Sequence, residues 1–331
     1  MLINFLHIGP QKTGSTAIQK SLLESTDYLL GKNIEYPKIG MTQYGHHELV
    51  WDIRDQKAAE SYKDLAKINN SVLLSSENFC FFNKSHIDTL VGYLPVRQFK
   101  VCYYVRRLAP AWLSHWQQAI KTGSWQTFPE YMLSALELQD QPVRNVYSLR
   151  NFEEVIESYA GIFGPENITI LDYEAIGSQT IIENFFTRFL QVEAPALHEP
   201  PTVINKSFDF RFNEFLRLAN QRYFFTQGKS AGIGLRQFIV KQKKEIERDG
   251  VLDALDDFVL WQTIPLEKIY RSEAYKIIEE RRSSIASRHG VFLPPLEFDE
   301  ESEKTLTFSS QQIGTPEFVE MIVQDYIQNP S

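Results

Sequence analysis

Residues 2–19 constrain the fold of this chain more than any other stretch. A short apolar run at residues 2–6 leads into the small-residue loop Gly9-Pro10-Gln11-Lys12-Thr13-Gly14, and helix-forming residues follow from Ser15. This order predicts a strand, a phosphate-binding loop and a helix. The loop glycines let main-chain N–H groups turn inward, and the positive end of the following helix adds to them, so the expected occupant is an anionic phosphate.

The position of the lysine separates this loop from the common nucleotide-triphosphate loop, in which a lysine directly follows the second glycine. Gly9 and Gly14 keep the usual glycine spacing, but Ser15 stands at the lysine position and Lys12 lies inside the loop. Lys12 would then place a point charge near a bridging or terminal phosphate oxygen. A plainer alternative is a loop of small residues that merely turns the chain.

An acid follows the next apolar strand. Val72-Leu73-Leu74 runs into Ser75-Ser76-Glu77, which predicts a buried strand with Glu77 at its carboxyl end. Ligands of open α/β sheets gather at the carboxyl ends of the strands, so Glu77 is a candidate for chemistry. Alternatively, Glu77 caps the following turn or pairs with Arg106 or Arg107.

The loop at 9–16 and a second segment at 99–116 resemble the sulfotransferases that use 3′-phosphoadenosine 5′-phosphosulfate (PAPS). Their 5′-phosphosulfate loop has the pattern P-K-[ST]-G-[ST]-[ST], which this chain matches with one inserted residue, Gln11. Their 3′-phosphate motif is an apolar strand that ends in Arg, with a Ser eight positions later on the following helix. The apolar run 99–105, Arg106 and Ser114 match that motif. The resemblance implies that Arg106 and Ser114 converge on one phosphate. Arg107 and His115 have no such role, and we expect them to be solvated.

A third segment extends the resemblance to about residue 190. Residues 167–174 predict a strand that ends in Tyr-Glu, and residues 181–190 predict an amphipathic helix. In the family, this Tyr lies near the adenine, and Tyr173 matches it. A strand-terminal acid such as Asp172 would also suit magnesium in an NTPase, which is the strongest feature of the alternative function.

The chain departs from the family at two points. The adenine-stacking Trp that follows the family's loop is absent, because Ala17 stands there. The late Arg-Lys-Gly segment that grips the 3′-phosphate in cytosolic members also has no counterpart. Lys229 and Arg236, in a predicted flexible basic loop at 228–236, are weak substitutes.

The adjacent histidines His46 and His47 raise the question of a metal site. Neighbours in a helix point about 100° apart, and no Cys or second His lies three or four positions away to complete a site. We expect a surface pair, or one histidine that touches substrate.

In the family the general base is either a His that ends the strand before the 3′-phosphate strand or a Glu elsewhere in the cleft. Glu77 is therefore the predicted base, and either histidine of the pair, His46 or His47, is the alternative.

The remaining sequence sets the fold class and domain organisation. We predict an α/β fold with a P-loop-like central parallel sheet flanked by helices and a mainly helical C-terminal elaboration. The predicted domain covers 1–295, and 296–331 form an acidic linker and a last helix. Further helices are expected at 57–69, 84–94, 127–161 with a break at 139–142, 205–220, 265–288 and from Pro316.

Composition limits the partners and the compartment. The net charge of −8 argues against broad nucleic-acid binding. Cys80 and Cys102 are too few for a disulfide framework or a four-cysteine zinc site, and no signal peptide or membrane span is evident. The sequence therefore predicts a cytoplasmic protein, with its oligomeric state open.

Taken together, the resemblance implies a sulfotransferase that moves a sulfuryl group from PAPS to an acceptor hydroxyl or amine and releases PAP, with no metal required. A carbohydrate acceptor is favoured. The predicted catalytic residues are Lys12, Glu77 and His47, and the predicted cofactor-binding residues are Gln11, Lys12, Thr13, Gly14, Ser15, Thr16, Arg106, Ser114 and Tyr173. The alternatives are a magnesium-dependent nucleotide phosphotransferase with an unusual loop and a nucleotide-binding module without catalysis.

Overall fold

The computed structural model describes residues 2–57, 60–135, 148–174, 180–195, 208–294 and 305–329. The chain divides into two compact units. The first comprises Met1–Arg107, Val143–Ile204 and Ile277–Phe298, and the second comprises Leu108–Pro142, Asn205–Lys276 and Asp299–Ser331. The predicted boundary between 295 and 296 lies outside the described residues.

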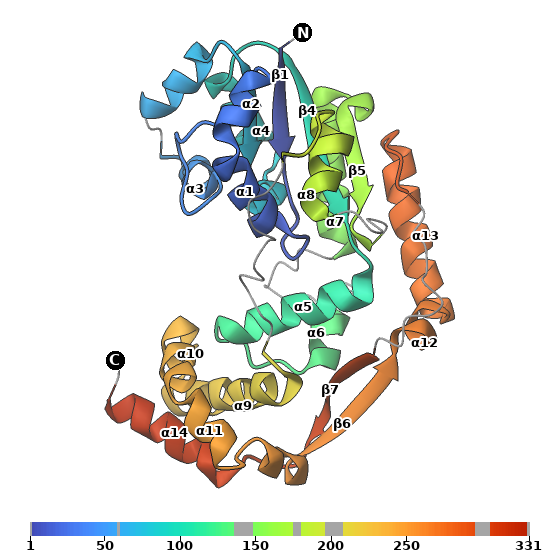
Figure 1. Ribbon diagram of the computed structural model, residues 1–331. Helices are drawn as coiled ribbons and strands as arrows, with labels where there is room; N and C mark the ends of the chain where they lie inside the picture. The colour runs from blue at the N-terminus through green and yellow to red at the C-terminus, as the bar shows by residue number, and fades with distance from the viewer. Residues whose placement is uncertain are drawn as a thin grey trace. The chain divides into compact units, whose positions relative to one another are not determined.

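The first unit is built on a parallel sheet with the strand order β2-β3-β1-β4-β5 (Figure 1). The strands are β1 (Ile3–His7), β2 (Ile34–Glu35), β3 (Ser71–Ser75), β4 (Gln98–Val105) and β5 (Ile168–Asp172). Every residue of β3 is buried, as expected for a strand that is covered on both faces. The predicted α/β fold with a central parallel sheet flanked by helices is confirmed.

Helices cover both faces of this sheet. The helices of the first unit are α1 (Ser15–Glu24), α2 (Thr26–Gly31), α3 (His47–Arg54), α4 (Lys84–Tyr93), α7 (Leu149–Phe163), α8 (Ile181–Asn184) and the part of α13 (Glu273–Arg288) from Ile277 onward. Short 3₁₀ turns lie at η1 (Glu60–Lys67), η2 (Glu77–Phe81) and η3 (Pro165–Asn167), and the π-helical turn η5 (Phe185–Leu190) continues α8.

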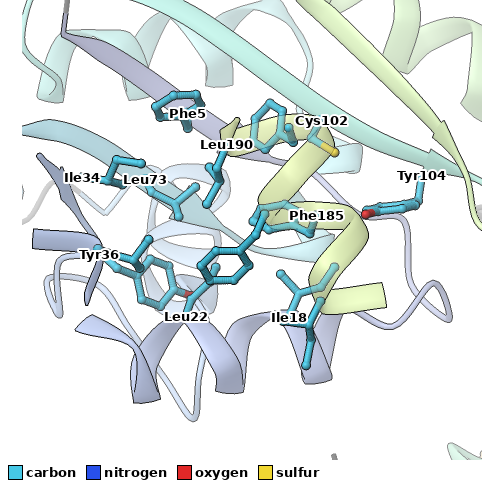
Figure 2. Close-up of a cluster of buried hydrophobic side chains, with 14 residues drawn as sticks. Phe5, Ile18, Leu22, Ile34, Tyr36, Leu73, Cys102, Tyr104, Phe185 and Leu190 are labelled. Carbon is cyan, nitrogen blue, oxygen red and sulfur yellow. The ribbon is translucent and has the colours of Figure 1, made fainter. Parts of the chain in front are cut away.

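Alternating residues of β4 pack on opposite faces of the sheet. On one face Phe99 stacks on Phe163 of α7, with 4.5 Å between the ring centroids. On the other face Tyr104 belongs to a buried cluster that includes Phe5 of β1 and Ile18 of α1, with further side chains from β3 and η5 (Figure 2). Fully burying a side chain of this size contributes about 1.5–3 kcal/mol, so these two layers hold the sheet and its loops in place.

The second unit is mainly helical. Its helices are α5 (Leu108–Lys121), α6 (Phe128–Ala135), α9 (Phe210–Gln227), α10 (Gly232–Lys241), α11 (Lys243–Arg248), the turn η6 (Asp253–Asp257), α12 (Leu266–Tyr270), the start of α13 and α14 (Glu317–Gln328). An antiparallel pair of strands, β6 (Val259–Pro265) and β7 (Thr305–Gln312), completes it.

A buried ion pair organises helix α9. Glu214 and Arg217 are both completely buried, and the Arg217 Nε lies 3.0 Å from each carboxylate oxygen of Glu214. Arg217 also donates to the main-chain oxygen of Trp125 and to Oε1 of Gln312, each at 3.0 Å. Three distant parts of the sequence therefore meet at one guanidinium group.

Several sequence predictions need correction. The predicted loop at 228–236 is helical from Gly232, where α10 begins, because Leu235 and Ile239 are buried. The predicted helix 265–288 is interrupted between α12 and α13, and the β6–β7 pair was not predicted. The segment predicted as a helix at 57–69 is a 3₁₀ turn where it is described. The break expected at 139–142 lies outside the described residues, and so does the acidic part of the linker expected after 295.

No helix in the described ranges is both long enough and apolar enough for a membrane span. The last predicted helix is present as α14.

Candidate active site

The loops that follow β1, β3, β4 and β5 are joined through their main chains at one edge of the sheet. The N–H of Ser76 donates to the carbonyl of His7 at 3.1 Å, and the N–H of Tyr104 donates to the carbonyl of Gly9 at 2.9 Å. The N–H of Tyr173 donates to the carbonyl of Val105 at 2.8 Å. These bonds place the loop at 9–16, Glu77, Arg106 and Tyr173 on neighbouring segments of the first unit.

The loop after β1 is closed by its own hydroxyl groups. Thr13 Oγ1 donates to the main-chain oxygen of Pro10 at 2.7 Å, and Ser15 Oγ donates to the same oxygen at 3.4 Å. Gly9, Lys12 and Gly14 have φ values of 86°, 67° and 77°, so the chain enters the left-handed region three times before α1 starts. Gln11 Nε2 donates to Oδ1 of Asn78, which connects this loop to the segment after β3.

The start of α1 suits an anion. Gly14 is its N-cap residue, so no side chain caps the helix, and its first turn contains no acid. The first N–H groups of a helix have no intrahelical partner, and together with the helix dipole they attract negative charge. Thr16 lies in this turn, directly after the loop that carries Lys12. These features fit a phosphate or sulfate group.

Glu77 lies directly against the loop. A Cβ atom on Gly9 would come within 2.7 Å of the Glu77 Cα, so only glycine allows this approach. Gln19 of α1 is buried and donates from Nε2 to the Glu77 Oε2 at 3.0 Å. The turn after β3 is capped by Ser76, whose Oγ accepts the N–H of Asn78. The Glu77 side chain is about a quarter exposed, at 24%.

The two adjacent histidines differ in what they contact, and both are buried, which contradicts the expected surface pair. His46 accepts the N–H of Ser75 at Nδ1 and contacts the carbonyl of Pro37 through Nε2. Burial lowers the pKa of His46 to about 4, although these two bonds act in the opposite direction. His46 is therefore a neutral structural residue.

His47 instead faces the acid. Its Nδ1 lies 2.8 Å from the Oγ of Ser76 and 3.9 Å from Oε2 of Glu77. Its ring stacks against Trp51, with 6.2 Å between the centroids. Both candidate bases thus lie close to one another, and Glu77 also abuts the loop at Gly9.

Arg106 is held between the loop and the end of β5. Its Nη1 donates to the main-chain oxygen of Lys12 at 2.8 Å, and its Nε donates to Oε1 of Glu174 at 3.3 Å. Its guanidinium carbon lies 5.0 Å from the centroid of the Tyr173 ring. The carboxylate partner of Arg106 is therefore Glu174, a residue that sequence reasoning did not place in the site.

Glu174 is also bound to the main chain, because its Oε2 accepts the N–H of Arg107 at 2.9 Å. Burial raises the pKa of the Glu174 carboxyl, and this effect outweighs the opposing influence of the Arg107 N–H and of Arg106. The sequence signal for Glu174 was the Tyr-Glu pair at the end of the strand. Asp172, the magnesium candidate, accepts the N–H of Glu174 at Oδ1.

Other predicted residues belong to the second unit. Ser114 lies on α5, so its convergence with Arg106 stays a prediction. Arg236 lies on α10, and Lys229 lies between α9 and α10. The expected solvation of His115 is wrong, because its Nδ1 is hydrogen-bonded to the hydroxyl of Tyr131. It is also wrong for Arg107 of the first unit, which is buried.

Comparison with known proteins gives limited results. No protein-family model and no curated protein matches the sequence. One similar solved structure is a sulfotransferase from Alicyclobacillus acidocaldarius, with 15% identity, a TM-score of 0.37, and coverage of 68% of this chain and 96% of that chain. Another is the sulfotransferase domain from the curacin biosynthetic pathway, with 12% identity, a TM-score of 0.34, and coverage of 59% and 76%.

Proposed function

We propose that this protein is a PAPS-dependent sulfotransferase that transfers a sulfuryl group to an acceptor hydroxyl or amine. One observation carries the proposal: the lysine loop, an acid and an arginine occupy neighbouring loops at the carboxyl edge of a parallel sheet. Arg106 contacts the main chain of Lys12 directly, and Glu77 abuts Gly9 of the same loop. The residues proposed to bind the donor and the candidate base Glu77 therefore lie at the same carboxyl edge of the sheet.

The donor would be held by two sets of residues. The loop and the first turn of α1 would bind the 5′-phosphosulfate, and Arg106 would bind the 3′-phosphate with its charged fork of donors. Ser114 would add a hydroxyl to the 3′-phosphate, and Tyr173 would lie near the adenine. The proposed loop ligands are Gln11, Lys12, Thr13, Gly14, Ser15 and Thr16.

When bound, PAPS supplies a sulfuryl group on a good leaving group. In the transfer, the S–O bond to the 5′-phosphate breaks, a new S–O bond forms to the acceptor, and the acceptor proton moves to a base. Lys12 would stabilise charge that grows on the departing phosphate. Glu77 would take the proton, because it abuts the loop at Gly9. His47 is the second candidate, because its Nδ1 lies 3.9 Å from the Glu77 Oε2.

Two further parts of the proposal concern the acceptor and the compartment. We favour a carbohydrate hydroxyl as the acceptor. Lipid, peptide and natural-product hydroxyls are the other acceptor classes to be screened. Cys80 and Cys102 are both buried free thiols, which supports a reducing compartment such as the cytoplasm. The proposed transfer needs no metal ion.

The magnesium-dependent phosphotransferase is the second candidate, since Asp172 ends β5 beside the site. Calorimetric titration separates the candidates. PAP binding without magnesium supports the sulfotransferase, and magnesium-dependent ATP binding without PAP binding would overturn it. A screen of acceptors with labelled PAPS then tests for transfer, and PAP binding without transfer to any acceptor would favour a non-catalytic binding module.

A further inference from the structure

The carboxylate of Glu174 occupies the side of Arg106 that faces the end of β5. Its Oε1 accepts the Arg106 Nε–H at 3.3 Å, and its Oε2 accepts the Arg107 N–H at 2.9 Å. The side chains of Arg106 and Glu174 are only 18% and 20% exposed. An anion that binds Arg106 must therefore approach a carboxylate that is already there and poorly hydrated.

The charges around Glu174 come from several elements. Arg106 follows β4, and Asp172 of β5 accepts the N–H of Glu174. From α13, Arg282 donates to the main-chain oxygen of Arg106 at 3.3 Å and pairs with Glu279 at 3.0 Å. The positive charge of Arg106 lowers the pKa of the Glu174 carboxyl, and the negative charge of Asp172 raises it.

We propose that Glu174 sets the affinity of this site for the 3′-phosphate, and that this phosphate binds together with a proton taken up by the Glu174 carboxyl. The inference rests on the proposed function, in which Arg106 binds the 3′-phosphate. In the free protein, the Glu174 carboxylate neutralises Arg106 and holds its guanidinium group. When the phosphate binds, Glu174 takes up a proton and stays beside Arg106.

The chemistry of the two protonation states supports this coupling. A dianionic phosphate beside a poorly hydrated carboxylate strongly disfavours the charged form of that carboxylate. Burial already raises the pKa of the Glu174 carboxyl in the free protein. A protonated Glu174 still accepts the Arg107 N–H through one oxygen, and its O–H becomes a donor that suits a phosphate. The bond that fixes Glu174 to the main chain is therefore kept in both states.

Calorimetry in buffers of different ionisation enthalpy measures the coupling directly. At pH 8 the 3′-phosphate is already fully ionised, so a proton taken up on binding must go to the protein. We expect wild-type protein to take up on the order of half a proton more with PAP than with adenosine 5′-phosphate, which lacks the 3′-phosphate. Glu174→Gln removes the titrating group and should abolish this difference.

Affinity gives a second readout. At pH 8, Glu174→Gln should bind PAP roughly three- to tenfold more tightly than wild type, because the repulsion is removed, and this ratio should fall toward one at pH 6. Adenosine 5′-phosphate should bind both proteins equally, which shows that the variant is folded. Glu154→Gln breaks an exposed pair with Arg150 and serves as the matched control, with no change in proton uptake.

Two results would overturn the inference alone: PAP binding by wild type without extra proton uptake, or weaker PAP binding by Glu174→Gln at every pH. Either result leaves the sulfotransferase proposal intact. If wild type does not bind PAP at all, the proposed function fails and this inference fails with it. The wild-type comparison of the two nucleotides does not depend on any variant.

Discussion

The Nη1 of Arg106 lies 2.8 Å from the main-chain oxygen of Lys12, although 94 positions separate the two residues in the sequence. This bond ties the end of β4 to the loop after β1. The group proposed to bind the 3′-phosphate therefore also supports the loop proposed to bind the 5′-phosphosulfate. Substitutions at these two residues are expected to affect different parts of the same ligand.

Arg106→Ala should weaken PAP binding by roughly 2–4 kcal/mol, because a charge-assisted contact to a dianion is lost. Adenosine 5′-phosphosulfate lacks the 3′-phosphate, so its binding should be weakened much less. The remaining loss of affinity would reflect the missing hydrogen bond from Arg106 to the main chain of Lys12. Calorimetric titration of both ligands measures the two effects. Equal losses would show that Arg106 has only a structural role.

Lys12→Ala should lower the rate of transfer more than it lowers PAPS affinity, because the charge that Lys12 meets grows toward the transition state. Lys12→Gln is a suitable control, since it keeps most of the side-chain length without the charge. Single-turnover kinetics at saturating PAPS separates rate from affinity. An unchanged saturated rate in both variants would remove Lys12 from the chemical step.

Glu77→Gln should reduce the transfer rate by roughly 10²–10⁴ while PAP binding stays normal, because an amide cannot accept the acceptor proton. His46→Ala should instead lower stability, since His46 bonds the main chain at Pro37 and Ser75. His47→Ala tests the second candidate base. Near-full turnover in Glu77→Gln, with a large loss in His47→Ala, would assign the base to His47.

Gly9→Ala should destabilise the protein by roughly 1–3 kcal/mol and greatly reduce transfer. The new methyl group would lie 2.7 Å from the Glu77 Cα, at a backbone φ of 86° that alanine adopts poorly. Gly31→Ala is the matched control, because no atom lies within 4 Å of its Cβ position. Urea unfolding of both variants tests this, and similar stabilities would argue against the close approach of Gly9 and Glu77.

Stability should fall as the pH drops below about 6.5. Burial lowers the pKa of His46 to about 4 and that of His7 to about 3. Between pH 6.5 and these values, the unfolded chain binds protons that the folded protein does not, so each histidine lowers the free energy of unfolding by roughly 1 kcal/mol per pH unit. His7→Leu should reduce the slope of stability against pH, measured by urea unfolding from pH 7 to 4.5. An unchanged slope would mean that His7 does not contribute.

The sequence predicted the sheet and the position of the loops because the evidence is local. Apolar runs such as 72–74 and 99–105 can only be buried strands in this context, and parallel strands bring their carboxyl ends to one edge. That rule was enough to bring Lys12, Glu77 and Arg106 onto neighbouring loops.

Features that depend on distant partners were not predictable in the same way. Thr263 pairs with Thr307 between β6 and β7, and nothing in either segment alone identifies the other. The role of Glu174, which follows β5, depends on the position of Arg106, which follows β4. His46 and His47 are adjacent in the sequence, yet one is fixed between two main-chain groups and the other faces Glu77. A sequence motif cannot distinguish them.

The buried guanidinium of Arg217 has a consequence for how the chain folds during its synthesis. Its partners come from Glu214 nearby, from Trp125 well before it and from Gln312 of β7 well after it. During synthesis, α9 therefore emerges long before the strand that completes its polar contacts. A buried charge without its full set of partners is costly, so we expect the second unit to stay open until β7 has left the ribosome, while the sheet of the first unit already has all five strands.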